Sequence, residues 1–286
     1  MSRVRVVVLT LVALVAFAAN SILCRLAFER SDIDPASFTS IRLLSGALSL
    51  WLIVTLRRAA HGIDGNWPSA AALFVYAAAF SFAYVSLPTG VGALLLFGAV
   101  QTTMILAGLR AGERLNSRQG VGLTLALGGL GYLMLPGLSA PPLAGSLLML
   151  AAGIAWGMYS LRGRGAADPL GATAGNFLRA ALLGIGLGMS ALPWLQPDAA
   201  GAGYAVISGA LTSGVGYAVW YAALRGLAAT HAATVQLSVP VIAAAGGTLL
   251  LNAPVTLRLA LASVVILGGI ALVVLGRSGE SGRASR

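Results

Sequence analysis

The sequence contains little charge, no lysine and almost no cysteine. Only 9% of its 286 residues are charged, whereas 58% are hydrophobic, and the mean hydropathy is +0.90. A soluble domain of this length needs much more charged surface, so the composition predicts an integral membrane protein that crosses the bilayer several times. Cys24 is the single cysteine, which excludes an internal disulfide and a cysteine-based metal site.

Catalytic motifs are also missing. The sequence has no HExxH, no Ser/Lys pair or paired aspartates at membrane depth, and no GxxxxGK[ST] loop for ATP hydrolysis. We therefore expect no enzymatic activity, no cofactor and no bound metal. The eight acidic residues all fall in predicted loops or tails, namely Glu29, Asp32, Asp34, Asp64, Glu113, Asp168, Asp198 and Glu280.

Long apolar runs predict an all-α protein with ten membrane-spanning helices, because about 20 apolar residues cross the hydrocarbon core. The predicted spans are 4–24, 36–56, 69–87, 89–109, 119–135, 143–161, 170–194, 203–224, 228–251 and 256–275. The breaks between them carry turn or charge signals such as "RSDIDP" and "PGLSAPP".

Arginines in the short loops predict the orientation. With the N-terminus inside, 13 arginines face the cytoplasm and 3 face outward, so we expect both termini in the cytoplasm of a bacterium and the chain in its inner membrane. The net charge of +10 is spread over these loops rather than clustered, so nucleic acid is not an expected partner.

Two arginines interrupt the apolar spans. Arg42 lies in the second span and Arg179 in the seventh, 137 residues later. The same offset aligns "AANSILCR" with "AWGMYSLR", and "AGERLNSRQGVGLTLALGGLGYLM" resembles "LLNAPVTLRLALASVVILGGIALV". Because each copy has five spans, an odd number, the two copies are expected to be inverted relative to each other, with a substrate site between them near the bilayer midplane. We expect repeats at 1–137 and 138–276 and a cytoplasmic tail at 277–286. The two arginines either snorkel to the headgroups or line the pathway.

These features together resemble the drug/metabolite transporter superfamily, EamA type, over nearly the whole chain. The resemblance rests on ten spans in two halves, an arginine early in the second span of each half, and the acidic residue in "AGERLNSRQGVGLTLALGGLG". Among these proteins it is closest to bacterial exporters of amino acids and aromatic amino acids. Asn252 stands where the first copy has Glu113, which departs from the repeat. The resemblance implies a cavity lined by spans one, three, four, six, eight and nine, with spans five and ten peripheral.

Polar and aromatic residues at helical spacing are the candidate substrate-binding residues. They are Asn20, Tyr76, Phe80, Tyr84, Phe97, Gln101, Trp156, Tyr159, Tyr217, Trp220, Gln236 and Ser238, and packing between helices is the competing explanation for each of them. Pro240 is expected to kink span nine and free the carbonyl of Gln236.

The predicted function is a secondary transporter that exports small metabolites by alternating access, with neutral or aromatic amino acids favoured. No span contains Asp or Glu, so we expect facilitative movement, or coupling through a group that the sequence does not reveal. Carriers of sugar phosphates, nucleotide sugars or drugs remain alternatives within the superfamily, and a membrane-embedded enzyme or a receptor is the alternative of another class. The expected partners are the lipid bilayer and a small-molecule substrate, and we expect a monomer or weak homodimer.

Overall fold

The computed structural model describes residues 1–57, 62–112, 114–137, 140–164, 166–192, 198–227 and 229–281, without the side chains of residues 229, 230 and 276–281. All regular structure in these residues is helical. The helices are α1 (Arg3–Arg30), α2 (Pro35–Leu56), α3 (Trp67–Tyr84), α4 (Thr89–Arg110), α5 (Ser117–Met134), α6 (Leu143–Arg162), α7 (Pro169–Ser190), α8 (Ala199–Ile207), the π-helix η2 (Ser208–Val215), α9 (Gly216–Leu224), α10 (Ala229–Gln236), α11 (Val239–Leu251) and α12 (Leu257–Ser281).

Within the described residues, nine segments are long and apolar enough to cross a membrane, with α8, η2 and α9 counted as one span. The tenth predicted span is α5, an 18-residue helix whose first turn contains Arg118 and Gln119. Large apolar side chains face outward, for example Trp51 (46% exposed) on α2 and Leu249 (81% exposed) on α11. An exposed apolar surface of this kind suits contact with lipid rather than water.

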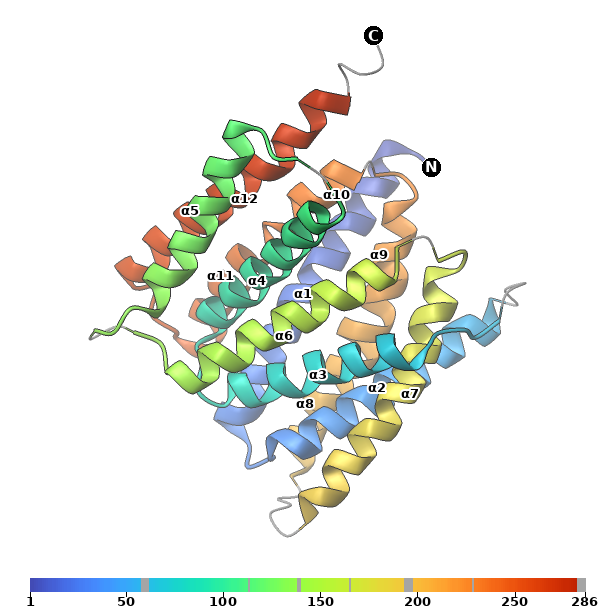
Figure 1. Cartoon of the computed structure of the whole chain (residues 1–286). Coiled ribbons are helices and arrows are strands. Elements are labelled where there is room, and N and C mark those ends of the chain that lie inside the picture. Colours follow the sequence, from blue (N-terminus) through green and yellow to red (C-terminus); the bar gives the residue numbers. More distant parts are fainter. Residues whose placement is uncertain are drawn as a thin grey trace.

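The two halves pack as inverted copies. Figure 1 shows α1 running away from the N-terminal end of the molecule and α6, its counterpart, running back toward it. Counterparts pair with each other, since α2 packs on α7 and α5 packs on α12. Contacts between non-equivalent helices also come in matching pairs. In the first pair α3 packs on α6, and in the second their counterparts, η2 with α9 and α1, pack on each other. The predicted fold class, an all-α membrane protein of two inverted five-helix repeats, is confirmed.

Three predicted spans differ in detail. The first helix continues to Arg30, so Glu29 lies in its last turn rather than in a loop. Span eight was expected to be one regular helix, but it widens into the π-helix η2, where Gly209 packs against the backbone of Arg42. Span nine, in which Pro240 was expected to cause a kink, is divided into α10 and α11, and Pro240 lies in the first turn of α11. The end predicted for span seven, Trp194, lies outside the described residues, as does Glu113.

Glycines allow the closest helix contacts. A Cβ on Gly122 of α5 would lie 2.5 Å from the carbonyl oxygen of Gly269 on α12, and the reverse distance is the same. A Cβ on Gly153 of α6 would lie 2.6 Å from the Cβ of Ala99 on α4. Small residues at such contacts let membrane helices approach through their backbones.

Acidic residues in the loops act as helix caps. Asp34 accepts a hydrogen bond from the Ser37 N–H at the start of α2, and Asp168 accepts one from Leu170 at the start of α7. Asp198 caps α8 in the same way, and its hydrogen bond from the Gly201 N–H lowers the pKa of its carboxyl group. At least these three acidic residues therefore serve to cap the N-terminal ends of helices.

Candidate functional site

A cavity of about 770 Å³ lies between the two halves. Its walls come from α1, α3, α4, α6, α7, η2, α9 and α10, with two residues of α12 at the edge. Gly163 and Arg164 of the α6–α7 loop line one end and are exposed, so the cavity reaches the surface there. Its volume falls in the range of about 300–1,000 Å³ that is usual for small-molecule sites.

Most of the candidate substrate-binding residues meet in this cavity. Those that line it are Asn20, Tyr76, Phe80, Phe97, Gln101, Trp156, Tyr159, Tyr217, Trp220 and Gln236. They come from six of the predicted spans and are brought together only by the tertiary fold. Their role in binding substrate stays a prediction.

The remaining candidates lie outside the cavity wall. Tyr84 is buried at the end of α3, where its hydroxyl donates to the Thr89 carbonyl at 3.3 Å. Ser238 precedes α11 and donates to the Val235 carbonyl at 2.6 Å, while Pro240 lies in the first turn of α11. Arg42 is buried behind the wall, and Arg179 is half-buried and donates to backbone carbonyls.

Trp156 is the centre of an aromatic cluster. Its ring stacks on Tyr159 (centroids 5.2 Å apart) and on Tyr217 (5.4 Å), and it lies 4.8 Å from the ring of Tyr76. Phe17 of α1 packs against Tyr217 on another side. Flat π-faces on several helices offer a surface on which an apolar or aromatic ligand can stack.

Asn20 is the centre of a polar network in the same cavity, and Tyr76 links this network to the aromatic cluster. Its Oδ1 accepts hydrogen bonds from Ser208 at 2.7 Å and from Thr212 at 3.3 Å, both on the π-helix η2. Its Nδ2 donates to the Tyr76 hydroxyl at 3.4 Å. Ser208 and Thr212 were not predicted. Their i, i+4 spacing in span eight is the signal that could have suggested a shared helix face.

Span seven contributes a second polar wall that the sequence did not predict. The hydroxyl of Tyr159 donates to Thr173 Oγ1 at 3.2 Å, and Thr173 Oγ1 lies 3.0 Å from the Tyr221 hydroxyl. Asn176, one turn further along α7, also lines the cavity. Thr173, Asn176 and Arg179 are the polar positions of "GATAGNFLR". Their spacing of three residues is the signal that could have suggested a shared helix face, but the resemblance had assigned no lining role to this span.

The cavity has almost no charge. Of the described residues that line it, Arg164 at the exposed end is the charged one, and none is Asp, Glu or His. Gln101 is 5% exposed and makes no hydrogen bond within the described residues, so its amide is free toward the cavity. The site therefore offers neutral hydrogen-bonding groups and aromatic faces.

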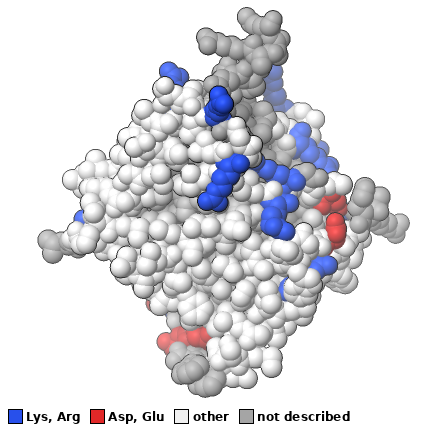
Figure 2. Space-filling view, viewed as in Figure 1, with Lys and Arg blue, Asp and Glu red and all other residues white. Residues whose placement is uncertain are grey.

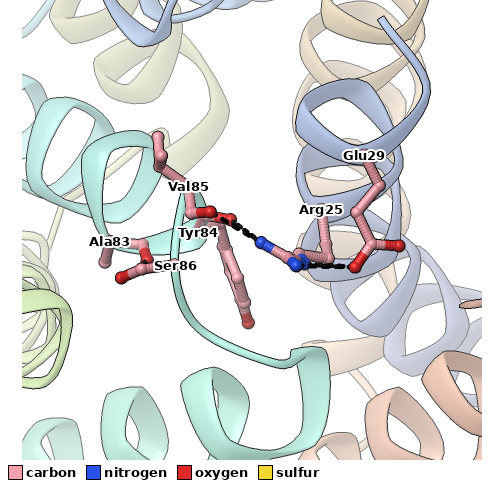
Figure 3. Close-up of polar contacts among 6 residues, drawn as sticks. All are labelled: Arg25, Glu29, Ala83, Tyr84, Val85 and Ser86. Carbon is pink, nitrogen blue, oxygen red and sulfur yellow. Dashed lines mark hydrogen bonds and ion pairs between the residues drawn. The ribbon is translucent and has the colours of Figure 1, made fainter. Parts of the chain in front are cut away.

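The other end of the helix bundle is closed by arginines on α1. Arg25 donates from Nη1 to the carbonyls of Tyr84 (2.9 Å) and Val85 (2.7 Å) at the end of α3, and it forms an ion pair with Glu29 at 2.6 Å. Figure 3 shows the Arg25 side chain between the end of α3, at Tyr84 and Val85, and Glu29 on its other side. Arg30 donates to the Leu250 carbonyl of α11 at 2.7 Å, so α1 is tied to both halves here.

Comparison with known proteins identifies the family. The family model described as "EamA-like transporter family" matches residues 4–135 and again residues 143–275, once on each half. The chain belongs to the EamA-like transporter family. It is therefore a multi-pass membrane transporter.

The relatives extend the match over the whole chain. The uncharacterized protein PA1977 of Pseudomonas aeruginosa is 56% identical over 280 residues, which cover 98% of both chains. The uncharacterized transporter YoaV of Bacillus subtilis is 22% identical over 253 residues, covering 84% of this chain and 87% of YoaV. One solved crystal structure has a TM-score of 0.65 at 20% identity and covers 96% of this chain and 98% of its own, which shows a shared fold.

Proposed function

We propose that this EamA-family transporter exports small metabolites, chiefly neutral or aromatic amino acids, by alternating access. The observation that carries the proposal is the composition of the cavity wall. Aromatic rings around Trp156 and free amides such as Gln101 line a space of about 770 Å³. Among the described residues that line it, the one charged residue, Arg164, lies at the rim. A molecule with an apolar or aromatic side chain and few charges fits such a wall.

A carrier of phosphate esters needs a different wall. A phosphate group carries up to two charges and is usually held by several lysines or arginines. The described lining offers Arg164 alone. The proposal therefore favours an amino acid over a sugar phosphate or a nucleotide sugar.

The distribution of arginines supports the proposed orientation. Figure 2 shows most of the arginines on this face gathered over the half of the molecule where α1 begins. Arginine-rich ends of membrane proteins face the cytoplasm. The open end of the cavity follows the end of α6, on this same side, so the structure corresponds to an inward-open state under this proposal.

Facilitative movement is part of the proposal. A proton-coupled carrier usually places a carboxylate or a histidine where it can bind the proton inside the membrane. None of the described lining residues is of this kind. We expect flux to follow the substrate gradient and to continue when an ionophore removes the pH gradient and the membrane potential.

The experiment is a substrate panel in proteoliposomes. Purified protein is reconstituted, and the efflux of radiolabelled phenylalanine, leucine, glutamate, a sugar phosphate and a nucleotide sugar is measured against empty liposomes. We expect phenylalanine and leucine to move down their gradients. Flux of the nucleotide sugar without flux of any amino acid would overturn the proposal.

A further inference from the structure

Arg42 is a buried cation that lacks full pairing. Its side chain is 2% exposed, and its Nη1 is buried without a hydrogen-bond partner. Among the described residues it forms no ion pair. Its Nη2 donates to the Tyr76 hydroxyl at 3.0 Å, and its guanidinium lies 4.8 Å from the Phe80 ring centre and 5.3 Å from that of Tyr76. Removing a guanidinium from water without a counter-ion is costly, and two aromatic faces offset only part of the cost.

The repeat does not explain this burial. Arg179 is the counterpart of Arg42 in the second half, 137 residues later. Its Nη1 donates to the carbonyls of Asp64 at 3.1 Å and Gly175 at 2.9 Å, and the side chain is only half-buried. The inverted architecture can therefore satisfy an arginine at this position with backbone carbonyls, and the first half does not do so for Arg42.

Tyr76 connects Arg42 to the cavity. The Tyr76 hydroxyl oxygen accepts from Arg42 Nη2 at 3.0 Å and from Asn20 Nδ2 at 3.4 Å. Two donors occupy the oxygen, so its own proton is left to donate. Ser208 and Thr212 hold the Asn20 carbonyl, which turns the Asn20 N–H groups toward Tyr76. Both Tyr76 and Asn20 line the cavity, with the positive charge of Arg42 directly behind them.

We propose that Asn20 and Tyr76, backed by Arg42, form a subsite for a carboxylate group. This inference rests on the proposed function and adds that the substrate must carry one negative group. The carboxylate accepts hydrogen bonds from the Tyr76 O–H and the free Asn20 N–H, and Arg42 supplies the compensating charge. The Trp156 ring lies 4.8 Å from that of Tyr76 and is therefore close enough to contact the side chain of an amino acid bound at this subsite.

The test compares two ligands that differ in the carboxylate. Uptake of labelled phenylalanine in proteoliposomes is inhibited with unlabelled phenylalanine or with phenylethylamine, which has the same ring and amine but no carboxylate. The variants are Arg42→Gln and Tyr76→Phe, with Arg179→Gln as the matched control. In Arg42→Gln and Tyr76→Phe the affinity for phenylalanine should fall about tenfold or more, while that for phenylethylamine changes less than about twofold.

Equal losses for both ligands, or the same selective loss in Arg179→Gln, would overturn the subsite. Should Arg42→Gln fail to fold, Tyr76→Phe decides the matter, because it keeps the ring contacts and removes only the hydroxyl.

A binding measurement separates this inference from the proposed function. Quenching of tryptophan fluorescence is titrated with phenylacetate and with its neutral amide. If the wild type moves no amino acid but binds phenylacetate in an Arg42-dependent way, the proposed function fails and the subsite stands. If it moves amino acids and the variants show no carboxylate selectivity, the subsite fails and the proposed function stands.

Discussion

The guanidinium of Arg25 donates to the backbone carbonyl of Tyr84 at 2.9 Å and so joins the end of α1 to the end of α3. This contact lies at the closed end of the bundle, beyond the cavity. Its counterpart in the second half is Arg162, 137 residues later, at the end of α6. Arg162 is exposed and donates to Ser69 at 3.3 Å instead of to the end of α9. The two equivalent arginines thus have different partners at the closed and open ends of the bundle, a difference that fits the alternating access proposed above.

Replacing Arg25 should loosen the closed end. Arg25→Gln removes the ion pair to Glu29 and weakens the bonds to the Tyr84 and Val85 carbonyls, and hydrogen bonds to charged groups are worth about 1.5–3 kcal/mol each. Cys24, buried and adjacent in sequence, is a natural reporter because it is the single cysteine. We expect maleimide labelling of Cys24 to become about tenfold faster. Arg162→Gln should instead slow labelling or leave it unchanged, and an unaltered rate in Arg25→Gln would contradict the role given to Arg25.

Replacing Trp156 should weaken substrate binding without unfolding the protein. Trp156→Ala removes ring contacts to Tyr76, Tyr159 and Tyr217, and aromatic pairs contribute about 0.5–1.5 kcal/mol each. The affinity for phenylalanine should fall about tenfold or more, measured as the concentration that half-saturates uptake. Trp51→Ala is the control, because Trp51 is 46% exposed on the outside of α2. Wild-type affinity in Trp156→Ala would remove this residue from the site.

Replacing Gln101 tests whether its amide contacts substrate. Gln101→Ala removes a cavity-lining group that has no hydrogen bond among the described residues, so the fold should lose little. A lost hydrogen bond of about 0.5–1.5 kcal/mol predicts a loss of affinity of about two- to twelvefold. Gln119→Ala is the control, because Gln119 accepts from the Asn116 N–H in the capping box of α5. Gln119→Ala should lower the melting temperature and keep the affinity. A lower melting temperature with unchanged affinity in Gln101→Ala would show that Gln101 is structural.

Enlarging Gly122 should destabilise the pair of helices α5 and α12. A Cβ at this position would already lie 2.5 Å from the Gly269 carbonyl oxygen, so Gly122→Leu forces the helices apart. We expect a loss of about 1–3 kcal/mol, seen as a lower melting temperature in detergent. Gly128→Leu on the same helix should have no such effect, because no atom lies within 4 Å of a Cβ there. Equal melting temperatures in the two variants would mean that the contact does not limit stability.

The broad fold was predictable because the bilayer imposes a simple rule on sequence. Each span must satisfy its own backbone in hydrocarbon, so length and apolarity reveal helices directly. The offset of 137 residues between Arg42 and Arg179, together with an odd number of spans in each copy, predicted the inversion. The π-helix at Ser208–Val215 was not predictable, since small and polar residues there are compatible with a regular helix as well.

The cavity was predictable only in part. Aromatic and amide residues such as Trp156 and Gln101 were candidates because buried indoles and amides need hydrogen-bond partners. Tyr84 had the same spacing as Tyr76 and Phe80, yet it lies at the closed end, because one helix face passes through both regions. Thr173 and Asn176 on α7 share an i, i+3 spacing, but only the packing of α7 against α3 and α9 placed them in the cavity wall.

Sequence alone determined that this protein is a bundle of apolar helices in two opposed copies, because hydrophobic run length and repeat parity are properties of the chain itself. Tertiary structure decided how two equivalent arginines differ. Arg179 is satisfied by nearby carbonyls, whereas Arg42 is buried behind Tyr76 with Nη1 unpartnered. The physical reason is that hydrogen-bond partners and burial depend on which helices meet in space, and identical positions in the two copies face different neighbours.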